Sequence, residues 1–382
     1  MKMIIAPDSF KGSLSAPEAA IAIEAGIKKV LPDAHTVLVP VADGGEGTME
    51  SLITSTYGRR VEVDVTGPMH VPVKAAYGIL GDQVTCVIEM ASASGLILVP
   101  PEVRNPMIST TYGTGELIRR ALDDGCRNFI VGIGGSATND GGIGMLQALG
   151  VRLLDADGNE VGFGGGELHR IVEIDDQNLD SRIRESHFLI ASDVQNPLIG
   201  PNGASHVFGP QKGATAEMVE SLDRSLGMWA DLVQAKTGIS LHQLEGAGAA
   251  GGIGGAFQSF FPSTMKRGID IVIEYTKLGE KMQDAALVFT GEGQVDYQTA
   301  SGKTPMGVAQ EAQKRGIPVF VLAGSIGSGI DTLYEYGIHS VTSIVNRPMS
   351  LAEAMEQASD LLAQTAEQVL RTYLSGTHLR SS

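Results

Sequence analysis

Short apolar segments alternate with helical segments at both ends of this 382-residue chain. Near the N-terminus, residues 3–6 and 36–41 predict strands on either side of one helix. Ser15 and Glu18 have the spacing of a capping box at the start of that helix, which we expect to end near Leu31. Strand–helix–strand alternation is typical of a parallel sheet covered by helices. The N-terminal end therefore predicts a parallel α/β unit.

The same alternation returns at the C-terminal end, after a stretch of different character. Strands are predicted at 285–290, 318–323 and 340–345, a helix at 305–315, and a long helix capped by Ser350 and Glu353. In between, three β-rich segments predict a meander, and a buried strand at 128–133 leads through glycines into a helix. The rest, to about residue 283, is expected to be mostly irregular, apart from a helix at 216–237.

The strand–helix alternation at both ends and the different pattern in the middle predict two domains of the α/β class. Residues 1–60 and 285–382 are expected to form one Rossmann-like parallel α/β domain from both termini. Residues 61–284 are expected to form a mixed α/β domain inserted between them.

Charge and composition narrow the class of protein. The formal net charge is −16, and so acidic a surface repels nucleic-acid phosphates and anionic lipid head groups. No apolar run approaches the roughly 20 residues of a spanning helix, and the first apolar run is too short for a signal peptide. Cys86 and Cys126 are expected to be reduced thiols. We therefore expect a cytoplasmic protein with small-molecule partners, and the sequence does not predict its oligomeric state.

Glycine is enriched in loops that follow apolar segments. The chain has 49 glycines, close to twice the usual ~7%, and Asp and Glu side chains occur in the same loops. Glycine lets backbone approach a ligand closely, and carboxylates are the ligands that Mg²⁺ prefers. Five such loops predict a site for a phosphate and its divalent metal, and their candidate residues are Asp8, Ser9, Lys11, Asp43, Glu46, Gly134, Gly135, Ser136, Thr138, Asn139, Asp140, Asp193, Thr290, Glu292, Asp296 and Lys303.

Two familiar nucleotide motifs almost match. Residues 246–251 fit GxGxxG, with Asp270 about 20 residues later, but no clear strand precedes them as a dinucleotide fold requires. Gly302, Lys303 and Thr304 end like a Walker A motif, but Tyr297 stands where its first glycine belongs. A dinucleotide-dependent oxidoreductase is therefore kept only as an alternative from a different class. A non-catalytic ligand-binding regulator is disfavoured, because a sensor does not need so many carboxylates.

Taken together, these segments resemble the bacterial glycerate kinase family, specifically the glycerate 2-kinase type. The resemblance covers essentially the whole chain and rests on segments 6–13, 42–48, 134–142, 192–198, 208–214 and 290–305. It implies the glycerate kinase type I fold, with the active site in the cleft between the domains. It also implies ATP-dependent phosphorylation of D-glycerate to 2-phosphoglycerate, with Mg²⁺.

Roles for single residues are hypotheses from charge and chemistry. The lysines Lys11, Lys212 and Lys303 would contact phosphate or the substrate carboxylate. Asp193 and Asp296 are the candidates for general base and metal ligand, in either order, and Asp8, Asp43 and Glu46 would support the metal or the glycerate hydroxyls. The loop at 134–140 would cradle the nucleotide phosphates. A kinase of another small hydroxy-acid stays open, and physics alone does not choose between the 2- and 3-hydroxyl groups.

Overall fold

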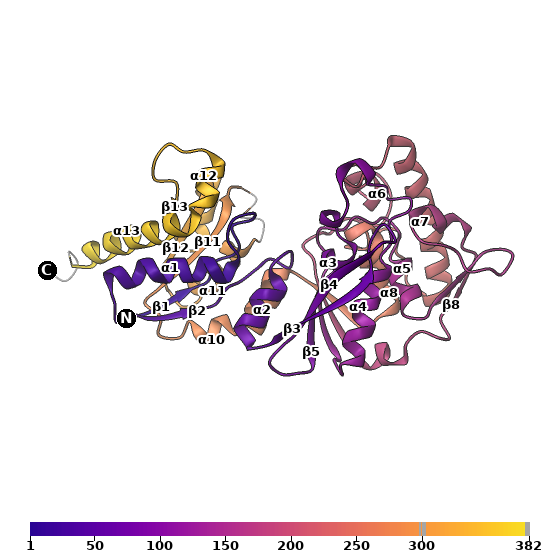
Figure 1. The fold of residues 1–382 in the computed structure, drawn as a ribbon, viewed down its shortest axis with the longest axis horizontal. Helices are drawn as coiled ribbons and strands as arrows, with labels where there is room; N and C mark the ends of the chain where they lie inside the picture. Colours follow the sequence, from indigo (N-terminus) through magenta and orange to yellow (C-terminus); the bar gives the residue numbers. More distant parts are fainter. Residues whose placement is uncertain (298, 300–302, 379–382) are drawn as a thin grey trace. The chain divides into compact units, whose positions relative to one another are not determined.

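A computed structural model describes residues 1–297, 299 and 303–378 (Figure 1). Its contacts divide the chain into two compact units. Unit 1 comprises residues 1–43, 50–56 and 269 onward, and unit 2 comprises residues 44–49 and 57–268. The sequence placed the second boundary at 284/285. It falls earlier because Ile269 packs in unit 1, where a Cβ built on Gly307 would lie 2.4 Å from its Cγ1.

Unit 1 is built on a five-stranded sheet of order β13-β12-β11-β1-β2, and every pair in it is parallel. Its strands are β1 (Lys2–Ile5), β2 (His35–Leu38), β11 (Leu287–Val295), β12 (Val319–Ile326) and β13 (Ile338–Ser343). Its helices are α1 (Ala16–Val30), α2 (Thr48–Thr56, mostly in this unit), α9 (Gly268–Tyr275), α10 (Leu278–Lys281), α11 (Thr304–Gln313), α12 (Leu351–Glu356) and α13 (Ala358–His378), with a 3₁₀ segment at Ile330–Tyr336. The parallel α/β architecture predicted from both ends is confirmed.

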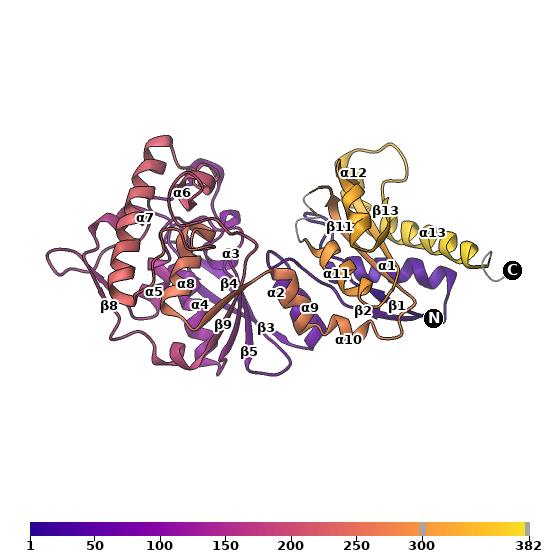
Figure 2. The ribbon, with the colours of Figure 1, turned by 180° about the vertical axis from the view of Figure 1, so that it is seen from behind.

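The helix starts in unit 1 follow the predicted caps. Ser15 and Glu18 form the capping box of α1, and Ser350 and Glu353 form that of α12. Helices α1 and α13 lie side by side on the sheet, as both ribbon views show (Figures 1 and 2). The prediction of a single long final helix was wrong, since α12 and α13 are separate helices.

One predicted glycine loop is a strand. Residues 290–293 lie inside β11, where Gly291 pairs with Leu322 of β12. A Cβ on Gly291 would lie 2.1 Å from the Leu322 carbonyl oxygen, so only glycine lets the two backbones approach this closely.

We expect the Gly291→Ala variant to lose about 1–3 kcal/mol of stability, because overpacking at this contact must push β12 away. Hydrogen exchange of the β11 and β12 amides should accelerate relative to wild type. Gly376→Ala is the matched control, because a Cβ there meets no atom within 4 Å. Equal exchange in the two variants would contradict this account of Gly291.

Unit 2 is built on a six-stranded mixed sheet of order β10-β9-β6-β5-β4-β3. The β3–β4 and β4–β5 pairs are antiparallel, which confirms the meander, and the remaining pairs are parallel. The strands are β3 (Arg59–Thr66), β4 (Pro72–Ile79), β5 (Thr85–Glu89), β6 (Asn128–Gly132), β9 (His187–Ala191) and β10 (Ser263–Lys266), and a small hairpin adds β7 (Arg152–Leu154) and β8 (Glu173–Asp175). The helices are α3 (Ala91–Ser94), α4 (Tyr112–Asp123), α5 (Ile143–Ala148), α6 (Ala204–Phe208), α7 (Ala216–Thr237) and α8 (Ile253–Phe260).

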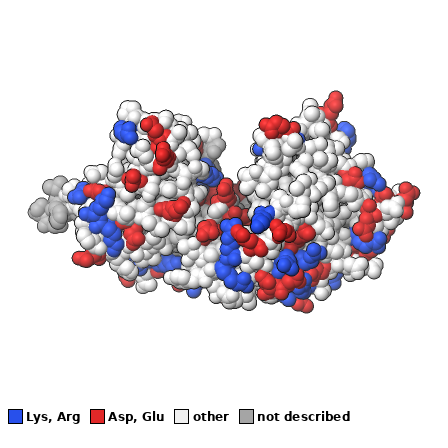
Figure 3. All heavy atoms as spheres, viewed as in Figure 1, with Lys and Arg blue, Asp and Glu red and all other residues white. Residues whose placement is uncertain are grey.

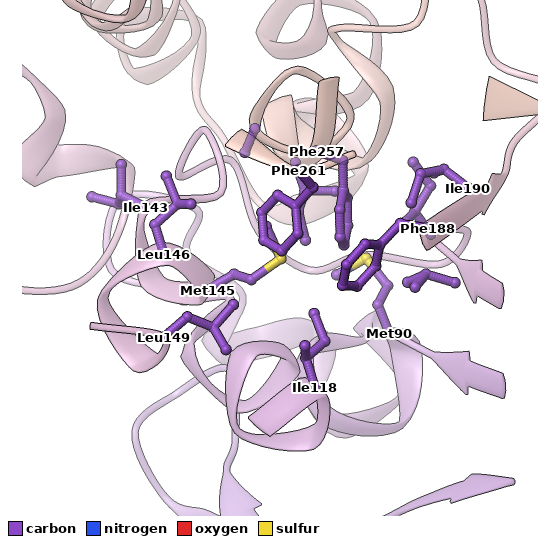
Figure 4. Packing of buried hydrophobic residues seen from close by; sticks show 14 of the residues in the cluster. Met90, Ile118, Ile143, Met145, Leu146, Leu149, Phe188, Ile190, Phe257 and Phe261 are labelled. Carbon is purple, nitrogen blue, oxygen red and sulfur yellow. The ribbon is translucent and has the colours of Figure 1, made fainter. Parts of the chain in front are cut away.

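Short 3₁₀ segments complete unit 2, and a large apolar core fills it. The 3₁₀ segments are Leu96–Leu98, Pro101–Val103, Gly165–Arg170, Ser181–Glu185, Pro210–Lys212 and Ala249–Gly252. Figure 4 shows Met145 of α5 and Ile118 of α4 packed with Phe188 of β9 and Phe257 of α8. The stretch that was expected to be mostly irregular contains the strands β7–β10 and the helices α6 and α8, so this expectation was wrong. Strands of three to five residues leave little periodicity to detect in the sequence.

The surface is acidic, as the composition requires. On the face in Figure 3, Asp and Glu side chains are spread over both units, with Lys and Arg interspersed. Among the described residues, no helix is long and apolar enough to cross a membrane.

Candidate active site

Three carboxyl groups gather at the carboxyl end of the parallel sheet in unit 1. Asp8 follows β1, Asp43 follows β2 and Glu292 lies in the second half of β11. The Asp8 amide donates to the Gly291 carbonyl at 2.8 Å, which fixes Asp8 beside β11. Strand ends at such an edge are where open α/β sheets bind ligands. We call Asp8, Asp43 and Glu292 the carboxyl cluster.

Burial and repulsion between carboxylates raise the pKa values of two members of this cluster. Burial and the negative charge of Asp43 together raise the pKa of Asp8 to about 6, against hydrogen bonds from Thr304 and Ser9. Burial likewise raises the pKa of Glu292 to about 7, opposed by a hydrogen bond from Thr299 and the charge of Lys303, and assisted by Asp8 and Asp43. A carboxyl group with a pKa near 7 can accept or release a proton at neutral pH.

Two threonines that the sequence did not single out as site residues hold the cluster. The Thr304 hydroxyl, at the start of α11, donates to Asp8 Oδ2 at 2.6 Å. The Thr299 hydroxyl donates to Glu292 Oε1 at 2.8 Å and accepts from the Asp296 amide at 3.2 Å. Thr299 therefore links two predicted site residues, Glu292 and Asp296.

The remaining predicted residues of unit 1 differ in exposure. Lys11 is exposed, Ser9 and Lys303 are half-buried, and Lys303 is the N-cap of α11. Asp296 is nearly buried, and its Oδ2 accepts from Gln294 Nε2 at 2.9 Å. Thr290 is fully buried, and its hydroxyl donates to the Ala6 carbonyl at 2.7 Å, so it ties β11 to β1. Gly302 lies outside the described residues.

The glycine loop of unit 2 joins β6 to α5 and is anchored by Asp140. The Asp140 side chain is fully buried, and Oδ2 accepts from the Thr111 amide and hydroxyl, both at 2.8 Å. Oδ1 accepts from the Gly142 amide at 3.1 Å. Burial raises the pKa of Asp140 and the bonds from Thr111 and the loop amides oppose that rise. Both carboxylate oxygens are thus used inside the protein.

Lys212 enters the same loop from a 3₁₀ turn. Its Nζ donates to Ser136 Oγ at 2.8 Å and to the Thr138 carbonyl at 2.6 Å. Burial lowers the pKa of Lys212 to about 7, against the charge of Asp140, which raises it. The predicted phosphate ligand is therefore a buried side chain that bonds to the loop itself.

The loop presents only part of itself outward. Gly134 and Gly135 are exposed, whereas Thr138 and Asn139 are fully buried. The Asn139 amide donates to Ser205 Oγ at 2.9 Å, while its Oδ1 and the Thr138 hydroxyl have no hydrogen-bond partner among the described residues. Buried acceptors without partners cost about 1–3 kcal/mol each, which a bound water or ligand donor would offset.

Glu89, at the end of β5, is a further residue at the predicted site that sequence reasoning missed. Its carboxylate accepts from the Met49 amide at 2.8 Å and from the Gly47 amide, at the start of α2. It therefore fixes the 44–49 segment, which carries the exposed Glu46. No motif surrounds Glu89, so its position at the end of a predicted strand was the only available signal.

Residues 246–251 follow α7 and a turn, with no strand described between them. A Cβ on Gly251 would lie 2.0 Å from the Thr138 carbonyl oxygen, so this glycine serves chain packing.

Asp193, a candidate metal ligand, is exposed in the segment after β9. Within the described residues, no three His, Cys, Asp or Glu side chains form a metal-binding group.

Comparisons with known proteins agree over the whole chain. The model of the glycerate kinase family matches residues 3–374. A glycerate kinase of Bacillus subtilis is 53% identical over 97% of both chains, and the glycerate 2-kinase of Escherichia coli is 48% identical over 98% of this chain and 99% of its own. The crystal structure of a presumed glycerate kinase 2 from Salmonella typhimurium LT2 matches with a TM-score of 0.91 and 48% identity, covering 99% of each chain. The chain belongs to the glycerate kinase family and is a kinase.

Proposed function

We propose that this kinase transfers the γ-phosphoryl group of ATP to the C2 hydroxyl of D-glycerate, giving 2-phosphoglycerate and ADP. Family membership supports ATP and glycerate as substrates, and the name of the Escherichia coli relative supports the 2-position. The observation that carries the chemistry is the carboxyl cluster, because it offers a proton acceptor with a pKa of about 7.

The C2 oxygen attacks the γ-phosphorus, and the bond from that phosphorus to the bridging oxygen of the β-phosphate breaks. The hydroxyl proton moves to Glu292 in the carboxyl cluster, while Asp8, bonded to Thr304, keeps a second proton site beside it. Lys11 and Lys303 offset the negative charge that spreads over the transferring group. Gly134 and Gly135, exposed at the carboxyl end of β6, offer backbone to the nucleotide phosphates.

The donor chemistry of the predicted metal ligands fits Mg²⁺. Asp193 and Asp296 supply carboxylate oxygens, and Mg²⁺ in kinases is held by one or two carboxylates plus the phosphates, so a group of three is not needed. When bound, the ion would neutralise charge on the β- and γ-phosphates.

The deciding experiment is turnover with ATP, Mg²⁺ and D-glycerate, followed by ³¹P NMR and by coupling to enolase. Direct conversion by enolase, without a mutase, establishes 2-phosphoglycerate. A product that needs the mutase establishes phosphorylation at C3. A panel of glycerate, tartronate and erythronate separates glycerate from another small hydroxy-acid as the substrate, and the absence of turnover with glycerate would contradict the proposal.

We expect Asp193→Asn and Asp296→Asn each to lower kcat by ~10²-fold or more, because each removes a candidate magnesium ligand. When Mg²⁺ is titrated in the assay, the variant that loses a metal ligand should need a higher Mg²⁺ concentration to reach half of its maximal rate. Asp64→Asn, at an exposed position of β3, is the matched control and should keep wild-type turnover. Unchanged kcat in both variants would contradict these assignments.

A further inference from the structure

Lys212 is the buried cation of unit 2 whose role the proposed reaction does not yet define. Only 2% of the residue is exposed, although lysine is among the residues least often buried. Taking an ammonium group out of water is costly unless it gains hydrogen bonds and a counter-charge. Here it gains both, from Ser136 Oγ, from the Thr138 carbonyl and from the charge of Asp140.

The two bonds of Lys212 join points on either side of Ala137 in the glycine loop. Ser136 is anchored in addition by a bridge to Gly95, and the Ala137 amide donates to the Ser94 carbonyl at 2.9 Å. Asp140 fixes the far end of the loop through Thr111. The path of the chain from Gly134 to Asp140 is therefore held by two buried side chains of opposite charge, Lys212 and Asp140, together with backbone bonds to residues 94–95.

The bond to Ser136 also has a direction. The Lys212 ammonium can only donate, so Ser136 Oγ must accept from it. The hydroxyl proton of Ser136 is then free to be donated to another acceptor, and the nearby positive charge makes it a stronger donor. Ser136 follows directly on Gly134 and Gly135, the exposed part of the loop.

We propose that Lys212 is a positioning residue: it holds the Gly134–Gly135 turn and orients the Ser136 hydroxyl to donate to a phosphate oxygen of the nucleotide, without touching the nucleotide itself. This inference rests on the proposed function, since it takes ATP as the ligand of the loop. It replaces the direct phosphate contact expected of Lys212 from the sequence.

Because Lys212 acts as an ammonium group, its loss of a proton should change loop order and activity with pH. The charged groups near it are Asp140 in the loop and Arg104, whose guanidinium donates to the Gln211 carbonyl one residue before Lys212. With a pKa of about 7, the ammonium is lost as the pH rises through neutrality. Loop order and kcat/KM for ATP should then fall on the alkaline side.

The test compares Lys212→Met, which keeps the length without the charge, with Lys212→Arg, which stays charged. A misplaced loop should lower kcat/KM for ATP by ~10²-fold in the Met variant. The Arg variant should recover part of this and should lose the alkaline fall in activity near pH 7. Lys74→Met, exposed on β4, is the matched control and should match wild type.

Substitution of Ser136, alone and together with Lys212, tests whether Lys212 acts through the Ser136 hydroxyl. Ser136→Ala is expected to lower kcat/KM, and the double variant with Lys212→Met should be no worse than Lys212→Met alone, because Lys212 acts through Ser136. Additive losses in the double variant would instead establish direct contact of Lys212 with the nucleotide. Ser136→Ala removes no charge. If Lys212→Met fails to fold, the test is the pH profile of kcat/KM of Ser136→Ala compared with that of wild type.

Hydrogen exchange of the 134–140 amides needs no substrate and separates this inference from the proposed function. It should accelerate in Lys212→Met, and it should accelerate in wild type above pH 7 beyond the ordinary base-catalysed rate. Unchanged exchange would overturn the positioning role even if glycerate is the substrate. A wild-type protein that shows these exchange effects but no glycerate turnover would overturn the substrate and the nucleotide role, while leaving Lys212 as the residue that orders the loop.

Discussion

Glu292→Gln is expected to lower kcat by ~10²–10⁴-fold, the range for loss of a positioned proton acceptor. The glutamine keeps the size of the side chain and can still accept from Thr299, whose hydroxyl donates to Glu292 Oε1 at 2.8 Å. What it loses is the ability to take the proton of the C2 hydroxyl. The measurement is kcat under saturating ATP and glycerate, with Glu335→Gln, at an exposed position of unit 1, as the matched control.

The pH profile separates a base from a merely structural carboxyl group. A base must be ionised, so the acid side of the wild-type kcat/KM profile should rise with the pKa of about 7 to which burial raises Glu292, while loss of the Lys212 ammonium sets the alkaline fall. The variant should lack this rise. Asp8→Asn removes a negative charge that raises the pKa of Glu292, so it should move the rise to lower pH. A rise that persists in Glu292→Gln would assign the titration to another group.

Ionisation of Glu292 should activate the base but lower the stability of the folded protein. The pKa of Glu292 is 4.5 in its ordinary state and about 7 in the folded protein, so the folded state holds its proton more tightly. The resulting stabilisation is complete below pH 4.5 and is lost as the pH rises through about 7. At pH 8 the ionised, buried carboxylate opposes folding, and Glu292→Gln should then unfold at a higher temperature than wild type. At pH 4 the two should be nearly equal.

Much of the fold could be predicted because local patterns report on it. The capping boxes at Ser15 and Ser350 are local signals, and the structure has both. The parallel edge that carries Asp8 followed from strand–helix alternation. Residues 291–293 were misjudged for a physical reason: the two glycines, Gly291 and Gly293, were interpreted as a loop, but glycine also allows close approach of strands, as at Gly291 and Leu322.

The site was predicted less well, because residue type does not reveal side-chain direction. Asp140 and Lys212 have the chemistry of ligands for phosphate and metal, yet both side chains are buried and bond to protein groups. Thr304 and Glu89 act on groups far away in the sequence, 296 and 40 residues from Asp8 and Met49. No local pattern encodes such partners; only the folded chain brings them together.

Asp140→Ala is expected to give the largest loss of stability in unit 2, about 3–5 kcal/mol. The substitution leaves the Thr111 amide and hydroxyl and the Gly142 amide without their acceptor, in a fully buried place. It also leaves the Lys212 ammonium buried without its counter-charge. Removing one partner from a buried charge pair costs this much because the other charge stays desolvated.

Trp229 makes this loss measurable in the right unit. It is the one tryptophan of the chain, it is fully buried in unit 2, and a Cβ on Gly141 would lie 2.9 Å from its ring. Urea unfolding followed by its fluorescence should therefore report on the surroundings of Asp140. Asp157→Ala, at an exposed turn position, is the matched control and should leave the midpoint unchanged.

The Asp140→Asn variant distinguishes the charge from the hydrogen bonds. An asparagine oxygen can still accept from Thr111, but its amide faces donors where the second carboxylate oxygen stood, and the Lys212 counter-charge is gone. We expect a loss between those of wild type and Asp140→Ala, together with a Lys212 that deprotonates at lower pH. If Asn were as stable as wild type and kept its activity on the alkaline side, the charge of Asp140 would contribute nothing to the loop, and hydrogen bonding alone would account for its order.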